Sequence, residues 1–430
     1  MTFTAALALL SVLAAPLRAE GLTVSSYTAA ALASSPEVRS AEDAYRAADA
    51  ALKGQAAALV LPTLSFSFTE YPYGHDPFRS YRYNHGRFAV REGQAVTAAN
   101  WNLFNSFEDL QKTRAAAMAR RAAKNAWTAA RQDRAFAAIN AFYDLDAKTE
   151  LLGVAQQNLT DQKRQYDQSL DLYKNGMKSL ADLLKSETDW RSSELRIIAA
   201  EAERKRSLVA FNALLDRGAF DEAALTLDLK AGATDLPLVE PDFVRALDAR
   251  PEVAEAREDL ARARVAVQQA MQGILPNLKV DATWTKTRYA AGSGTTFPNP
   301  NHQIGLALTL PIGFNGFTQA FGVSAAKARL RRSEAARDAA LRTVKTEVYG
   351  AYINLEKVSR SYTVAVLKEE IAAKSFELVE RQYRQGAADA IRMNQAQNDY
   401  LSARVERALA LRDIFIDRAR YRRAVGDPLW

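Results

Sequence analysis

The chain has 430 residues, no cysteine and a formal net charge of +7. This length allows two or three compact domains. The lack of cysteine excludes a disulfide framework, a thiolate metal site, a cysteine nucleophile and a lipid carried on cysteine. Because 57 basic residues are interleaved with 50 acidic ones and form no basic block, the charge does not predict nucleic-acid binding.

The first residues have the pattern of an export signal. Residues 5–15 form an apolar run, and Pro16-Leu17-Arg18-Ala19 follows, with small or aliphatic residues where a signal peptidase would cleave. We predict a signal peptide over residues 1–19, with a short buried helix as the alternative. No later apolar stretch approaches the roughly 18 residues that a membrane helix needs, so a membrane crossing would have to use strands.

Two strands are expected next. Residues 64–69 alternate apolar with small polar side chains, which is the period of a half-buried strand. We predict strands at about 62–71 and 95–103, the second resting mainly on Trp101 and Leu103. Each is near the roughly 9–11 residues that cross an outer-membrane bilayer as part of a barrel.

A very long helix is expected after the strands. No proline occurs between Pro77 and Pro237, and Gly153 is the one glycine in residues 107–173. A helix over about 107–173 would be roughly 100 Å long at 1.5 Å per residue. Gly176 follows at the place of a left-handed C-cap. A returning helix is predicted at about 179–215, followed by a linker or equatorial segment over 217–240.

The second half of the chain repeats the first. Phe-Asn-Ser-Phe at residues 104–107 returns as Phe-Asn-Gly-Phe at 314–317, and Tyr-Lys-Asn-Gly at 173–176 returns as Tyr-Arg-Gln-Gly at 383–386, both 210 residues later. Such a register indicates two copies of one unit. We therefore predict a mainly helical fold with a small membrane β part and a duplicated unit, in repeats 20–216 and 241–430. The second repeat holds strands at about 277–289 and 302–311, a long helix at about 317–383 and a returning helix at about 389–425.

Four strands cannot close a barrel. An open sheet edge that faces lipid leaves backbone groups unpaired, at a cost of several kcal/mol each. The chain must therefore share a barrel between protomers, with eight strands from two copies or twelve from three; the arithmetic does not choose between them. Small polar side chains on one strand face suit the inside of a duct: Ser65, Ser67, Thr283 and Thr285.

The whole pattern resembles the TolC-like outer-membrane efflux protein family. The resemblance covers the chain after the signal and is carried by sequence features that occur twice: Pro-Glu-Val at 36–38 and 251–253, Leu-Pro at 61–62 and 275–276, the segments around Phe104 and Phe314, and the turns at 173–184 and 383–395. It implies a homotrimer in the bacterial outer membrane, with a shared 12-strand barrel continuous with a long α-helical barrel in the periplasm. It further implies contact with outer membrane lipid, with a periplasmic adaptor protein and with an inner-membrane pump, either proton-driven or ATP-driven, for efflux or type I secretion.

The resemblance also implies roles for the residues of the two turns. The tips that meet the adaptor would be Asn175, Gly176, Met177, Gln385, Gly386 and Ala387. A periplasmic gate would include Asp182, Tyr383, Arg392 and Gln395. The family often has acidic residues in the second turn, where this chain has Arg392 and Gln395, so a neutral or basic ring is expected. The alternatives are that the glycines are only helix caps and that each gate residue lies on a solvated helix face.

The sequence predicts no enzyme, no cofactor and no metal site. His75, His85 and His302 are all expected in the two loops that connect the strands, and metal sites need three or four convergent ligands. The aromatic and basic loop 71–93 could close the barrel mouth or bind an outside partner. The favoured function is a passive exit channel. The alternative is a structural or adhesive coiled-coil envelope protein with a β anchor.

Overall fold

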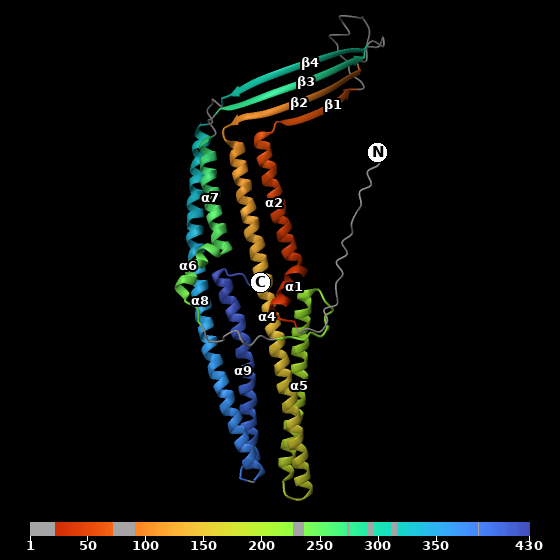
Figure 1. Ribbon diagram of the computed structural model, residues 1–430, viewed down its shortest axis with the longest axis vertical. Helices are drawn as coiled ribbons and strands as arrows, with labels where there is room; N and C mark the ends of the chain where they lie inside the picture. The colour runs from red at the N-terminus through yellow and green to blue at the C-terminus, as the bar shows by residue number, and fades with distance from the viewer. Residues whose placement is uncertain are drawn as a thin grey trace. The chain divides into compact units, whose positions relative to one another are not determined.

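The structure is a computed structural model that describes residues 22–71, 91–226, 236–272, 276–290, 296–310, 316–385 and 387–430 (Figure 1). The expected signal peptide at 1–19 and the tip residue Gly386 lie outside these ranges. So does most of the loop 71–93, together with the repeat residues Phe314 and Asn315 and the Leu275 of the second Leu-Pro.

The chain divides into two compact units that cross the sequence repeat. Unit 1 consists of Met1–Val38, Ala130–Ala246 and Lys345–Trp430, and unit 2 of Arg39–Ala129 and Leu247–Val344. The unit boundary falls inside helices α4 (Glu108–Lys174) and α8 (Gly316–Arg384). Each unit therefore contains part of both repeats, because the two ends of so long a helix pack against different neighbours.

Unit 2 contains a four-stranded antiparallel sheet in the order β1-β2-β3-β4. Its strands are β1 (Thr63–Tyr71), β2 (Arg91–Asn105), β3 (Asn277–Ala290) and β4 (Thr296–Thr309). β2 and β4 begin earlier than the predicted 95 and 302. In β4 the extra residues include Pro298 and Pro300, which lower the strand signal but are tolerated because β4 lies at an edge of the sheet.

The two faces of the sheet differ in polarity. The register pairs Ser65 with Ala98 and Ala98 with Thr283, so the serine and the threonine share a face. Ser67 and Thr285 share the same face through Val96. The opposite face carries large exposed apolar side chains: Leu64, Phe66, Phe68, Trp284, Ile304, Leu306 and Leu308. One face of the sheet is therefore mostly polar and the other mostly apolar.

Among the described residues, most of the helical part of unit 2 comes from α2 (Pro36–Val60), the first part of α4, α7 (Pro251–Gln272) and the first part of α8. α2 packs on α4 through Tyr45 and Trp127, whose ring centroids are 5.7 Å apart. Arg121 of α4 forms an ion pair of 2.8 Å with Glu258 of α7. Stacking and ion pairs thus join neighbouring helices that leave the sheet.

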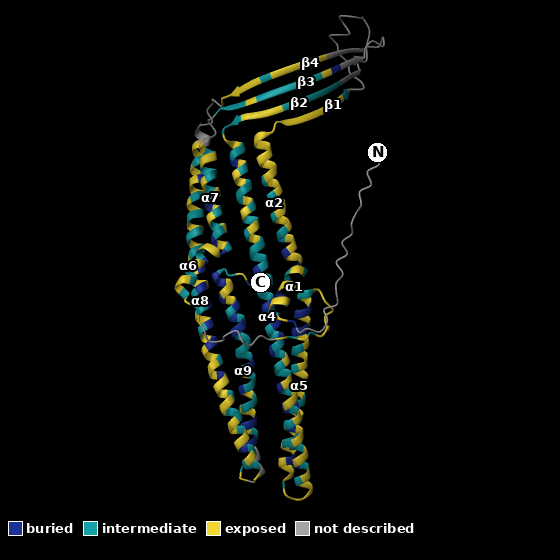
Figure 2. Cartoon of the chain, in the orientation of Figure 1, coloured by how far each residue is buried: buried dark blue, intermediate teal, exposed yellow. Residues whose placement is uncertain are grey.

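Unit 1 contains a compact aromatic core. It is formed by α1 (Val24–Ser34), the middle of α4 and α5 (Leu180–Leu215), where Figure 2 shows buried residues gathered. Tyr27 stacks on Phe211 at 4.0 Å between ring centroids, and its hydroxyl donates a hydrogen bond of 2.9 Å to the Phe211 carbonyl oxygen. Phe142 completes the core. Unit 1 also holds α6 (Val239–Ala249), most of which belongs to it, α9 (Ala390–Val425) and the second part of α8.

None of the described helices combines the length and the apolar character that a membrane crossing requires.

Candidate functional site: the turns of the two helical hairpins

Each repeat ends in a helical hairpin whose turn carries the predicted site residues. The first hairpin joins α4 to α5 and the second joins α8 to α9, and both turns belong to unit 1. In the first turn, Gly176 has a φ of 69°, and the Met177 N–H donates to the Leu172 carbonyl oxygen at 2.8 Å. Gly176 N–H donates to Tyr173 O at 2.9 Å. This is a Schellman cap, which requires a residue that tolerates the left-handed region.

Asp182 takes part in a capping box at the start of α5. The Ser179 hydroxyl accepts from the Asp182 N–H at 3.2 Å, and the Ser179 N–H donates to Asp182 Oδ2 at 3.4 Å. The Ser179 hydroxyl also donates to Oδ2 at 2.7 Å. These bonds, with the charge of Lys178, lower the pKa of Asp182 below the usual aspartate range. The carboxylate is exposed and bound to its own turn.

The second turn shares one backbone hydrogen bond with the first but has a different N-cap. The Ala387 N–H donates to the Gln382 carbonyl oxygen at 2.8 Å, as Met177 does in the first turn. Asp389 is the N-cap of α9 and accepts from the Arg392 N–H at 2.8 Å. Arg392 thus occupies the position that Asp182 occupies in α5, but a guanidinium has no acceptor with which to complete a box. Arg392 and Gln395 are both exposed.

Tyr383 is the predicted gate residue that contacts the other hairpin. Lys178 Nζ donates to the Tyr383 hydroxyl at 3.1 Å and to Ser169 Oγ at 3.3 Å. The ammonium also lies 5.8 Å from the centre of the Tyr383 ring. Lys178 did not stand out in the sequence, because a lone lysine in a polar turn has no distinguishing pattern.

Further polar contacts join the hairpins beyond the turns. Asn394 Nδ2 donates to Asp189 Oδ2 at 3.3 Å. Gln397 Oε1 accepts from Gln165 at 2.8 Å and from Gln162 at 3.4 Å. Gln397 is 2 % exposed, and its Nε2 has no hydrogen-bond partner among the described residues. Together with Lys178 and Tyr383, these side chains form what we call the polar seam.

Within each hairpin the packing is aromatic and apolar. Tyr166 stacks on Trp190 with ring centroids 5.1 Å apart, and Phe376 stacks on Tyr400 at 5.8 Å. The two pairs occupy equivalent places in the two repeats, 210 residues apart. Val379, Met393 and Ala396 form an apolar cluster in the second hairpin. Each hairpin therefore has its own apolar packing, while the contacts at the polar seam depend on hydrogen bonds.

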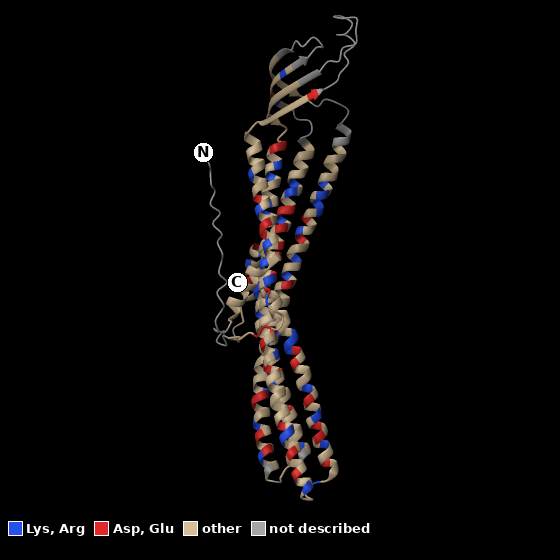
Figure 3. Ribbon diagram, turned by 90° about the vertical axis from the view of Figure 1, so that its right-hand side faces the viewer, with Lys and Arg blue, Asp and Glu red and all other residues tan. Residues whose placement is uncertain are grey.

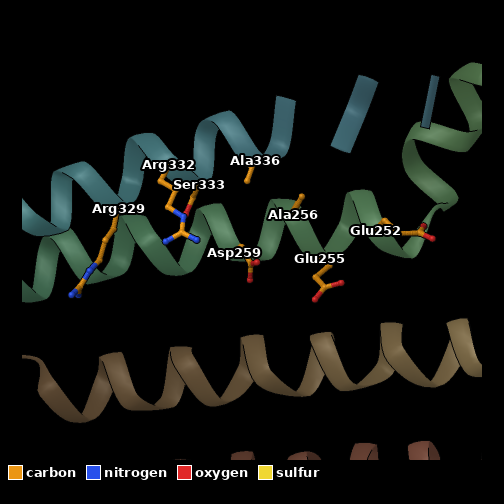
Figure 4. A pocket seen from close by; sticks show the side chains of 8 residues that line it. All are labelled: Glu252, Glu255, Ala256, Asp259, Arg329, Arg332, Ser333 and Ala336. Carbon is orange, nitrogen blue, oxygen red and sulfur yellow. The ribbon is translucent and has the colours of Figure 1, made fainter. Parts of the chain in front are cut away.

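A charged pocket of about 510 Å³ lies in unit 2, between α7 and α8 (Figure 4). Acidic side chains come from α7 and basic ones from α8: Glu252, Glu255, Asp259, Arg329 and Arg332. Glu252 is paired with Arg250 and Asp259 with Arg262. Figure 3 shows basic and acidic residues interspersed along the helices. In the described part of the chain, no group of three or more histidine, aspartate or glutamate side chains could hold a metal ion.

Comparison with known proteins gives concordant findings. The family model described as "Outer membrane efflux protein" matches residues 28–217 and 243–427. The protein CyaE of Bordetella pertussis is 24% identical over 332 residues, covering 75% of this chain and 68% of that protein.

Solved structures with the same fold share little sequence with this chain. A membrane protein from Pseudomonas aeruginosa superposes with a TM-score of 0.80 at 18% identity, covering 94% of this chain and 90% of that one. The CmeC outer membrane channel of Campylobacter jejuni gives 0.80 at 16% identity, covering 94% and 85%. The mainly helical, duplicated fold expected from the sequence is confirmed by these superpositions.

Proposed function

The chain belongs to the outer membrane efflux protein family, and on that basis we propose that it is the outer-membrane channel of a tripartite efflux or secretion system. In this proposal the channel conducts substrate passively across the periplasm and the outer membrane. An inner-membrane pump supplies the energy, and a periplasmic adaptor protein joins pump to channel.

The observation that carries the proposal is the sheet of unit 2. One face is apolar and the other carries small polar residues such as Ser65 and Thr283. In the part of the chain that the structure describes, β1 and β4 each pair with one neighbour, so both edges of the sheet are open. Backbone groups at such edges must be paired in lipid. Three copies would close a twelve-stranded barrel with its apolar face toward lipid and its polar face toward the lumen.

The surface of unit 1 independently supports a cyclic assembly of identical chains. A ring of identical chains needs two different faces on each chain, because every contact joins unlike surfaces. α8 exposes an apolar row at helical spacing: Ile353, Val364, Leu367, Ile371 and Leu378. α5 exposes a second row: Leu184, Leu195, Ile198 and Val209. The two helices lie at the two sides of unit 1 in Figure 1. We propose that the row on α8 packs against the α5 side of the next chain.

The hairpin turns would form the periplasmic end. We propose that the polar seam, above all Lys178 with Tyr383, holds this end closed, and that Asp182 contributes by fixing the turn of its own hairpin. The exposed tips would contact the adaptor: Asn175, Gly176, Met177, Gln385, Gly386 and Ala387. Met177, which is 69% exposed, is the largest apolar side chain among them.

Arg392 and Gln395 would line the closed entrance as a basic and neutral ring. Replacing Arg392 with alanine should then shift ion selectivity toward cations. The change removes one positive charge from each of the three proposed chains, at a narrow constriction where charges are poorly screened. Reversal potentials in a salt gradient measure this shift. Unchanged selectivity would remove Arg392 from the pore.

Localisation and mass test the assembly. The protein should fractionate with the outer membrane, and light scattering of the detergent-purified protein should give the mass of three chains. A dimer would favour an eight-stranded closure instead. A monomer without membrane association would contradict the proposal.

A further inference from the structure

A second pocket, of about 410 Å³, lies in unit 2 where the sheet gives way to helices. It is formed by the first two turns of α4 and the last turn of α7. Phe107 directly precedes α4, and its carbonyl oxygen accepts from the Gln111 N–H at 3.0 Å. Gln111 and Arg114 lie on one face of α4, since three residues span nearly one helical turn. The pocket is lined by Phe107, Leu110, Gln111, Arg114, Gln268 and Met271. Its volume is within the usual range for small-ligand sites.

Two polar groups at this pocket lack partners among the described residues. Gln111 is 2% exposed, and its Oε1 is buried with no hydrogen bond to any described residue. A buried amide oxygen without a donor is unfavourable, so native structures rarely contain one without a reason. Arg114 is exposed at the pocket and forms no ion pair or hydrogen bond with the described residues. The site therefore offers an amide oxygen that could accept a hydrogen bond and a guanidinium that could bind an anion.

The apolar side of the pocket depends on a strained backbone. Ser106 and Phe107 have φ values of 55° and 65°, a region that bulky residues rarely adopt. This conformation places the Phe107 ring beside Phe104, at 5.0 Å between centroids, and leaves it 44% exposed at the pocket. Met271 on α7 is 48% exposed at the same pocket. Strain of this kind concentrates at ligand sites, where it sets a side chain in place.

We propose that this pocket binds a phospholipid of the surrounding bilayer, with the phosphate on Arg114 and acyl carbons against Phe107, Leu110 and Met271. A guanidinium matches the geometry of a phosphate, and methionine adapts to irregular chains. The proposal rests on the proposed function, because α4 begins three residues after β2 ends at Asn105, which puts the pocket at head-group depth if the sheet lies in the membrane.

The probes are dioleoyl phosphatidylglycerol, which carries a phosphate, and dioleoylglycerol, which has the same chains without one. The full chain is purified in dodecyl maltoside, and bound lipid is counted by native mass spectrometry. We expect one saturable phosphatidylglycerol per chain, and at least tenfold weaker binding of dioleoylglycerol, since a hydrogen bond to a charged group contributes about that much. Equal binding of the two probes would overturn the proposal.

Variants locate the site. Arg114→Gln should weaken phosphatidylglycerol binding about tenfold, because a charged hydrogen-bond donor is lost. Arg331→Gln is the matched control, since Arg331 is also exposed, lies in unit 2 and lines neither pocket; it should bind as the wild type does. Equal loss in both variants, or loss in neither, would contradict the assignment.

The source of the ligand is tested with lysophosphatidylglycerol, a soluble single-chain amphiphile with the same head group. A bilayer lipid is supported if the two-chain probe displaces the single-chain one, and it is overturned if only the single-chain probe binds. Conductance of the same preparation distinguishes failure of the lipid-site proposal from failure of the channel proposal. A conducting protein without the lipid site would refute only this inference, and a lipid-binding protein without conductance would refute only the channel.

Discussion

Asp182 and Arg392 occupy equivalent places in the two hairpin turns, three residues after the N-caps Ser179 and Asp389. The resemblance to the family assigned both to a gate, from their spacing after the glycines. The structure adds that Asp182 completes a capping box, for which Ser-x-x-Asp at 179–182 was a readable signal. The contact between Lys178 and Tyr383 could not be read from the sequence, because it joins residues 205 apart through a turn geometry that no local pattern encodes.

Replacing Ser179 with alanine should destabilise the first hairpin. The change removes the acceptor for the Asp182 N–H, and the loss of an N-cap typically costs about 1 kcal/mol. Thermal or denaturant unfolding followed by circular dichroism measures this loss. Ser192→Ala, an exposed serine within α5, is the control and should leave stability within about 0.5 kcal/mol of the wild type. Equal effects of the two changes would contradict the capping role.

Two aspartates should give stability profiles of opposite sign with pH. Burial, with the nearby Glu150, raises the pKa of Asp146 on α4 to about 6, above the unfolded value of about 3.9. The folded state therefore holds this proton more tightly, and stability falls as the pH rises from about 4 to about 6. Asp146→Asn should remove that loss, so the stability of the variant relative to the wild type should increase between about pH 4 and about pH 6.

Asp182 should behave in the opposite way. Its folded pKa is lowered, so its contribution is present above the unfolded pKa and is lost as the pH falls through the folded value. Asp182→Asn should be less stable than the wild type at pH 7, and the difference should shrink in acid. Unfolding midpoints across pH 3 to 8 measure both variants. If the stability difference from the wild type changed with pH in the same direction for both variants, the environment described for one of the two aspartates would be contradicted.

At the scale of elements, composition and periodicity indicate α4 and α8 well. Their interiors lack proline and almost lack glycine, and α4 covers Glu108–Lys174 where a helix over about 107–173 was predicted. The starts of β2 and β4 were missed, because Gly93, Pro298 and Pro300 weaken the strand pattern while cross-strand pairing extends the ladder. Local propensity was overruled there by hydrogen bonds to neighbouring strands.

The apolar row on α8 yields a prediction about assembly. Ile371→Glu places a charge in the middle of that row, where Ile371 is 60% exposed in the single chain. If the row is a contact between chains, burying an unpaired carboxylate there should dissociate the trimer. Light scattering in detergent measures the mass. Ile371→Leu keeps the surface apolar and should remain trimeric, whereas a trimeric Ile371→Glu would exclude this face from the interface.

At the scale of the whole molecule, the duplication predicted two copies of one structural unit, but it did not predict how the chain divides into two compact units. Each compact unit takes segments from both repeats, because α4 and α8 are long enough for their two ends to join different units. The sequence repeat could not predict this division, because it identifies similar segments but not the segments that pack against one another. The open edges of β1 and β4 are the basis on which we propose an assembly of several chains.

Conductance in planar lipid bilayers tests the central claim, a passive channel, most directly. The purified protein is added without nucleotide and without a proton gradient, and current is recorded at fixed voltage. We expect stepwise, energy-independent conductance, with open events more frequent by up to about tenfold in Tyr383→Phe, which loses the hydrogen bond from Lys178. Membrane-inserted trimers that carry no current, in the wild type and in Tyr383→Phe alike, would contradict the channel and favour a structural or adhesive role.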